Sequence, residues 1–127
     1  LTKYISAYGG KYGDEKNIFM QNANVFILPS HNECFPLVLL EAMEQGLPCI
    51  STNEGGIPAI IENGKTGYII EKHSPKVIAE KIEYLMEHPQ QCINMGEAGK
   101  EKFFNEFTLD KFEIRMKNIL EDCIISL

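Results

Sequence analysis

The sequence predicts an α/β fold in which a doubly wound, mostly parallel sheet is followed by C-terminal helices. Residues 25–28, 48–52 and 68–70 are short apolar runs, as expected for parallel strands that are buried on both faces. Helical or loop segments separate these runs, which is the alternation typical of such a sheet. Beyond the third run, apolar residues recur at helical spacing. We therefore divide the chain into an α/β core, residues 1–73, and C-terminal helices, residues 74–127.

Composition excludes several classes of protein. The 127 residues are 44% apolar, which is enough for one domain with a hydrophobic core. The net charge of -6 argues against a surface that binds nucleic acid or anionic membranes. No apolar stretch is long enough to span a membrane, and no signal peptide is present. The four cysteines lack the spacing of zinc ligands, so we expect reduced thiols in a cytoplasmic protein.

The first expected element is a strand over residues 4–8, which ends at a glycine-rich turn. Asp14 is placed to cap a helix that runs to about Asn22, with Ile18 and Phe19 facing inward. The apolar strand of residues 25–28 follows, so this part of the sequence predicts a strand–helix–strand unit.

A second helix follows the loop after residues 25–28, and its start can be placed in two ways. Ser30 and Glu33 fit a capping box, which would start the helix at His31. Pro36 would then lie inside the helix, at a cost of about 3 kcal/mol. At the first helical position the same proline is favoured, because its missing N–H would be unpaired anyway. We therefore expect the helix to begin at Pro36. Phe35 would then be the N-cap residue, and its side chain has no atom that can accept a hydrogen bond.

This start predicts an anion site. The amides of Leu37, Val38 and Leu39 would have no side-chain partner, and free amides at a helix N-terminus favour an anion such as phosphate. Glu33 in the loop and Glu41 just over a turn into the helix would flank that phosphate. A ligand with hydroxyl groups on both sides of a phosphate would suit this arrangement.

The remaining elements follow from local signals. Residues 57–62 are predicted to form a short helix, and Ser74, Pro89 and Thr108 mark the starts of three longer ones. We expect these three amphipathic helices to have a structural role. The last of them carries one apolar stripe: Phe112, Met116, Ile119, Leu120 and Cys123.

Several motifs of this chain occur together and in order. They are Glu33-x7-Glu41 within Leu28-Pro29-Ser30 to Ala42-Met43, then Gly46-Leu47-Pro48, Gly55-Gly56-Ile57-Pro58 and Glu62-Asn63-Gly64-x-x-Gly67. This set resembles the signature of retaining GT-B glycosyltransferases of family 4, the glycosyl transferases group 1. The likeness covers roughly residues 5–107.

The resemblance implies the C-terminal, donor-binding half of a GT-B fold. The chain would be a partial nucleotide-sugar-binding domain with a Rossmann-like sheet, truncated at its N-terminus, because the strands are few. It begins with Leu, so we expect a piece of a longer protein whose missing N-terminal domain binds the acceptor. The parent would transfer a sugar from a nucleoside diphosphate sugar to an acceptor with retention of configuration. We expect residues 1–127 alone to be inactive.

The resemblance also implies roles for individual residues. Glu41 would bind the ribose hydroxyls, because a carboxylate has two acceptor oxygens for a vicinal diol. Pro36 stands where the family commonly has glycine, so no amide donor is available there. The transferred sugar would contact Glu33, Phe35, Pro36 and Leu37. The phosphates would contact the backbone of Leu37, Val38 and Leu39. Possible further contacts are Ser30, His31, Gly55 and Gly56.

A UDP-sugar or GDP-sugar is the expected donor, with no cofactor. No Asp-x-Asp motif is present, and no metal is expected. Membrane association, at the inner face, would come only through the missing domain. Two alternatives stay open: a phosphorylase or epimerase of the same GT-B architecture, and a non-catalytic interaction module on the same scaffold. The second predicts no nucleotide affinity and no effect of changing Glu41.

Overall fold

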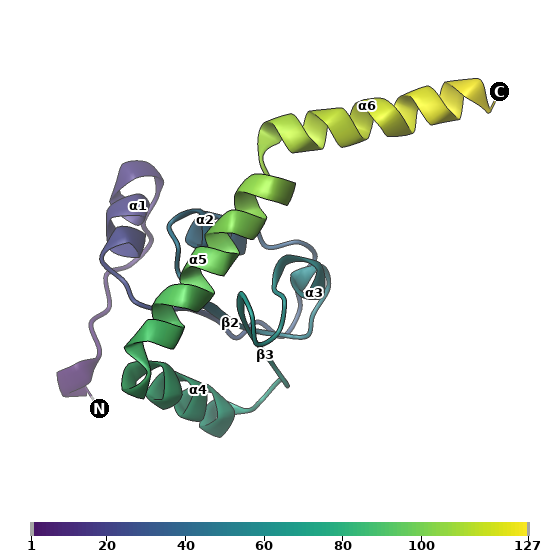
Figure 1. Cartoon of the computed structure of the whole chain (residues 1–127). Helices are drawn as coiled ribbons and strands as arrows, with labels where there is room; N and C mark the ends of the chain where they lie inside the picture. Colours follow the sequence, from purple (N-terminus) through teal and green to yellow (C-terminus); the bar gives the residue numbers. More distant parts are fainter. Residues whose placement is uncertain (1, 127) are drawn as a thin grey trace.

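The computed structural model describes residues 2–126 and shows an α/β fold (Figure 1). Three parallel strands form one sheet in the order β1 (Phe26–Leu28), β2 (Cys49–Thr52), β3 (Gly67–Ile70). The predicted parallel strands and their order along the chain are therefore confirmed.

The helical segments lie between and after these strands. They are η1 (Thr2–Tyr4), α1 (Gly13–Gln21), α2 (Leu37–Glu44), α3 (Ile57–Ile60), α4 (Pro75–Glu87), α5 (Pro89–Glu106) and α6 (Leu109–Ile125). The short helix α3 ends two residues earlier than the sequence predicts, and the starts of α4, α5 and α6 agree with the predicted signals at Ser74, Pro89 and Thr108.

The sheet is covered on both faces because side chains alternate along β2. Cys49 belongs to a buried cluster with residues of α2 and α3, whereas Ile50 belongs to a second cluster with Leu85 of α4 and Met95 of α5. Helices thus pack on opposite sides of one parallel sheet, as a doubly wound, Rossmann-like fold requires. The strand β1 is only half-buried, which differs from the prediction, because it lies at an edge of the sheet.

The N-terminal prediction is wrong in part. Residues 5–12 have no regular structure, and Tyr4 and Ile5 are 84% and 63% exposed. A strand needs a neighbouring strand for its backbone hydrogen bonds, and residues 4–8 have none in the described chain. The helix α1 forms as expected, but Asp14 makes no cap, and Ile18 and Phe19 lie 57% and 41% exposed.

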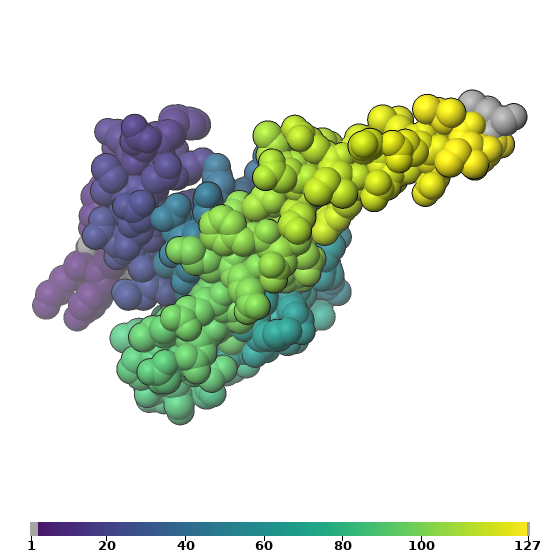
Figure 2. Space-filling model, turned by 45° about the horizontal axis from the view of Figure 1, so that its top comes forward, coloured from purple at the N-terminus to yellow at the C-terminus, as the bar shows by residue number. Residues whose placement is uncertain are grey.

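The last helix, α6, extends away from the body of the molecule (Figures 1 and 2). Thr108 caps it as predicted, because its side chain accepts a hydrogen bond from the amide of Lys111. None of the described residues of α6 is buried, so its apolar stripe does not pack on the core; Phe112 is 57% exposed and Ile119 is 56% exposed. No helix within residues 2–126 is both long and apolar enough to cross a membrane.

Candidate functional site

Three loops meet at the carboxyl edge of the sheet, because all three strands run in parallel. Residues 29–36 follow β1, residues 53–56 follow β2 and residues 71–74 follow β3. A hollow of about 240 Å³ lies between the first and the third of these loops, with His31, Thr52 and His73 in its lining. Ligands of open α/β sheets bind at this edge, outside the carboxyl ends of the strands.

Glu33 lies in the first of these loops and is held by Ser30. The hydroxyl of Ser30 donates a hydrogen bond of 2.8 Å to Oε1 of Glu33. The capping-box alternative is wrong, because residues 31–36 are not helical and Ser30 caps no amide. Oε2 of Glu33 has no hydrogen-bond partner within residues 2–126, so this oxygen is available to a ligand.

The helix α2 begins one residue later than the sequence predicts. Pro36 is its N-cap, with an extended backbone (φ -74°, ψ 103°), and Phe35 lies outside the helix. The carbonyl of Pro36 accepts a hydrogen bond of 3.1 Å from the amide of Leu39. The prediction that this amide is free is therefore wrong. The amides of Leu37 and Val38 have no acceptor among residues 2–126. Two amides, at the positive end of the helix dipole, therefore remain for an anion.

Glu41 is paired with a lysine that the sequence left unassigned. Nζ of Lys16, in α1, lies 2.6 Å from Oε1 of Glu41, in α2, and the two side chains are 29% and 38% exposed. The partners are 25 positions apart in the sequence, so no local pattern signals their contact.

The side chains of Phe35 and Leu37 line a different hollow from the one at the strand ends. Both line an apolar hollow of about 740 Å³ that they share with Phe107 and with Phe112 of α6. The ring of Phe35 lies 6.3 Å from that of Phe107, measured between ring centroids. Contacts of Phe35 and Leu37 with a polar ligand at the strand edge would therefore involve their backbone groups.

Gly55 and Gly56 lie directly under the loop that carries Glu33. The amide of Gly56 donates a hydrogen bond of 2.6 Å to the carbonyl of Cys34. A Cβ atom on Gly55 would collide with the carbonyl of Glu33, and one on Gly56 would collide with the ring of Phe35. The two glycines thus let one loop pack against the backbone of the other, which positions Glu33.

A further lysine ties the three loops together. Nζ of Lys72 lies 2.9 Å from Oε1 of Glu54 and 3.5 Å from the carbonyl oxygen of His31. The rings of His31 and His73 lie 4.2 Å apart, at an angle of 58°. The sequence analysis did not identify Lys72 or Glu54, because only the fold brings these three loops to one edge.

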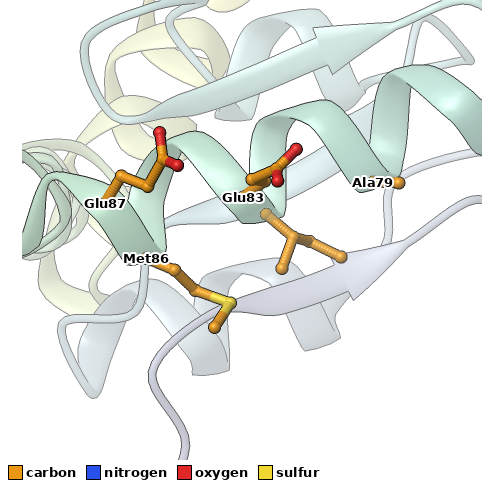
Figure 3. Close-up of a pocket in the computed structure, with 5 residues that line it drawn as sticks. Ala79, Glu83, Met86 and Glu87 are labelled. Carbon is orange, nitrogen blue, oxygen red and sulfur yellow. The ribbon is translucent and has the colours of Figure 1, made fainter.

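A separate hollow of about 560 Å³ lies along α4 (Figure 3). Its lining comes from one helix only: Ala79, Ile82, Glu83, Met86 and Glu87. None of these residues belongs to the strand-end loops, and we assign no function to this hollow. Within residues 2–126 no three His, Cys, Asp or Glu side chains form a group that could hold a metal ion.

Comparison with known proteins assigns the chain to a family. The family model of glycosyl transferases group 1 matches residues 1–102. N-acetyl-alpha-D-glucosaminyl L-malate synthase of Bacillus anthracis is 34% identical over 114 residues, which is 88% of this chain and 30% of that protein. The chain thus spans less than a third of the length of this curated relative.

Solved structures share the fold. Sucrose-phosphate synthase of Thermosynechococcus elongatus superposes with a TM-score of 0.78 at 24% identity, over 87% of this chain and 28% of that one. Anabaena HepE, solved in complex with UDP, superposes with a TM-score of 0.77 at 20% identity, over 82% of this chain and 29% of that one. These likenesses confirm the expected Rossmann-like half of a GT-B fold. The chain belongs to the family of glycosyl transferases group 1.

Proposed function

We propose that this chain binds the nucleoside diphosphate sugar from which its parent protein transfers a sugar, with retention of configuration. One observation carries the proposal: Glu33 and Glu41 stand on either side of the α2 N-terminus, where the amides of Leu37 and Val38 are free within residues 2–126. An anion site between two carboxylates matches a ligand whose diphosphate lies between two groups rich in hydroxyls.

The diphosphate binds at the amides of Leu37 and Val38. These amides and the helix dipole favour negative charge, and they become more favourable as charge develops on the leaving diphosphate in the transition state. Pro36 has no N–H, so the contact begins at Leu37. Leu39 contributes less than the sequence suggests, because its amide already donates to Pro36.

The two carboxylates bind the two sugars of the donor. Glu41 accepts hydrogen bonds from the ribose hydroxyls, and Glu33 accepts them from the transferred sugar. Ser30 holds Oε1 of Glu33 and leaves Oε2 for the sugar. Gly55 and Gly56 pack against the Glu33 loop, and the carbonyl of His31 accepts a hydrogen bond from Lys72, so these residues support the loop that carries Glu33.

UDP is the first nucleotide to consider, because crystal structures of HepE, which shares this fold, contain UDP and UDP-glucose. GDP is the alternative. The acceptor-binding part of the parent lies outside this chain in the proposal, so transfer by residues 1–127 alone is not expected. No metal or cofactor is proposed, since amide groups and the helix dipole supply the positive potential at the diphosphate.

The test is a titration of the isotope-labelled chain with UDP, UDP-glucose and GDP, followed by amide NMR spectra. We expect shifts that centre on Leu37 and Val38 and that weaken in Glu41→Gln. The matched control is Glu44→Gln, which removes an exposed carboxylate from the same helix and should leave the shifts unchanged. Affinity in the millimolar range is sufficient, because the proposal places part of the donor site in the rest of the parent protein.

The outcomes separate the hypotheses. Shifts at the α2 N-terminus that depend on Glu41 support the donor site, and the nucleotide that gives them identifies the base. No shift with any nucleotide, or equal shifts in Glu41→Gln and the unchanged chain, would contradict the proposed site and favour the non-catalytic module. Product analysis with the full-length parent then distinguishes a transferase from a phosphorylase or an epimerase.

A further inference from the structure

We propose that Lys16 is a positioning residue for ribose recognition, and that it acts through Glu41. This inference rests on the proposed function, in which Glu41 binds the ribose of the donor. It starts from the short contact between Nζ of Lys16 and Oε1 of Glu41, at 2.6 Å, which joins α1 to α2.

The contact leaves Glu41 with about three acceptor positions, enough for the two ribose hydroxyls. A carboxylate has about four acceptor positions on its two oxygens. Lys16 uses one of them on Oε1, and Oε2 has no partner within residues 2–126. The remaining position on Oε1 and those on Oε2 lie side by side, which suits two hydroxyls on neighbouring carbon atoms.

Positioning explains this pair better than stabilisation of the fold does. The side chains of Lys16 and Glu41 are 29% and 38% exposed, and ion pairs with this much exposure contribute little to stability. A free glutamate side chain samples several rotamers and loses that freedom when a ligand binds. Lys16 restrains Glu41 before the ligand arrives, which lowers the entropic cost of binding.

The lysine acts on the ribose and not on the diphosphate. Glu41 lies four residues beyond Leu37 in α2, which places it about 6 Å further along the helix axis from the free amides. Nζ of Lys16 contacts the carboxylate of Glu41, and no contact of this group with the amides of Leu37 or Val38 occurs within residues 2–126. Removal of Lys16 should therefore change the response to the 2′-hydroxyl and leave phosphate binding unaltered.

The experiment compares Lys16→Met with the unchanged chain in NMR titrations with UDP, with 2′-deoxyuridine diphosphate and with inorganic pyrophosphate. The matched control is Lys11→Met, which removes a lysine near the same helix that pairs with Glu15 and not with Glu41. We expect Lys16→Met to weaken UDP binding about three- to tenfold, which is the cost of immobilising one flexible side chain on binding. Affinity for the deoxynucleotide, which keeps only the 3′-hydroxyl, should fall less, and affinity for pyrophosphate should stay the same.

Two further variants guard against a general effect on the fold. Lys16→Arg keeps a cation in reach of Glu41 and should retain the preference for UDP over the deoxynucleotide, whereas Lys16→Gln should lose it. Amide spectra of all variants should superpose on that of the unchanged chain outside α1 and α2.

Equal losses for UDP, the deoxynucleotide and pyrophosphate would overturn the inference, because Lys16 would then contact phosphate. Unchanged or tighter UDP binding by Lys16→Met would also overturn it, the latter by showing that Lys16 competes with ribose. Failure of the proposed function looks different: the unchanged chain itself would show no shift with UDP, before any variant is compared.

Discussion

The backbone amide of Gly56 donates a hydrogen bond of 2.6 Å to the carbonyl of Cys34, which joins the loop after β2 to the loop that carries Glu33. Gly55, beside it, has a positive φ of 49° and lies against the backbone of Glu33. Lys72 adds an ion pair to Glu54 in the same loop. The position of the Glu33 carboxylate therefore depends on contacts between two loops, and this dependence can be tested.

Gly55→Ala should destabilise the protein and displace Glu33. The new Cβ would collide with the carbonyl of Glu33, and the left-handed backbone adds a cost of about 1–2 kcal/mol. The control is Gly64→Ala, which has a φ of 82° but open space around the added Cβ, so it should show the backbone cost alone. Thermal unfolding measures the difference. Equal midpoints for both variants would show that the loop adapts to the added Cβ.

Thr52→Val should loosen the loop after β1. The buried hydroxyl of Thr52 donates a hydrogen bond of 2.6 Å to the carbonyl of Ser30, and its loss should cost about 1–3 kcal/mol. Thr66→Val is the control, because the hydroxyl of Thr66 accepts from the amide of Glu62, away from this loop. Denaturant unfolding should show losses for both variants. Only Thr52→Val should shift the amide signals of Ser30 and Glu33.

Gly96→Ala and Gly99→Ala should have opposite effects, although both change a buried glycine in α5. A Cβ on Gly96 would collide with the carbonyl of Gly46, where α5 crosses the end of α2. A Cβ on Gly99 would make ordinary contacts of 3.6 Å with Met43 and Thr66. We expect Gly96→Ala to lose about 1–3 kcal/mol to overpacking, and Gly99→Ala to gain up to about 1 kcal/mol in helix propensity. Equal denaturation midpoints would contradict this packing.

The cysteines should differ in reactivity. Cys34 and Cys123 are exposed, whereas Cys49 is fully buried in β2. Burial raises the pKa of Cys49 from 9.0 to about 12, so its reactive thiolate is suppressed in the folded protein. Mass spectrometry after alkylation at mildly alkaline pH should show Cys34 and Cys123 modified and Cys49 intact. Full modification of Cys49 without denaturant would contradict its position in the core.

The same pKa predicts how stability depends on pH. Because the pKa of Cys49 is higher in the folded state, the unfolded chain loses this proton first as pH rises. The stabilising effect of the buried thiol is therefore complete below its unfolded pKa of 9.0 and is lost between 9.0 and about 12. Thermal midpoints should fall across this range in the unchanged chain and fall less in Cys49→Ala. Parallel curves for the two proteins would exclude Cys49 as a cause.

Local chemistry explains why much of the fold could be predicted. The three strands are apolar runs, and α4, α5 and α6 begin next to Ser74, Pro89 and Thr108, as predicted. Proline at a first helical position and a hydroxyl at an N-cap act within one turn of the chain, so they are readable without the fold. The prediction of Pro36 as the first residue of α2 was one position too early, because proline adopts the extended N-cap conformation as readily.

Elements that depend on distant partners could not be read in this way. Residues 4–8 have strand composition but no neighbouring strand in residues 2–126, so Tyr4 ends a short 3-10 helix and residues 5–8 are irregular. The stripe of α6 has helical spacing, but spacing cannot reveal that α6 extends away from the core. Composition and periodicity show which side chains of a segment could be buried. Whether another element packs against those side chains depends on the tertiary structure.

The candidate site also combines features that are local in the sequence with features that depend on distant residues. Glu33 and Glu41 could be placed on either side of a helix N-terminus from the sequence, because both belong to one loop–helix segment. Three other features depend on the folded chain: Lys16 contacts Glu41 from 25 residues away, Gly55 supports the Glu33 loop, and the amide of Leu39 is already used. Parallel strands bring loops that are distant in sequence to one edge of the sheet, and the contacts among those loops form only after the chain has folded.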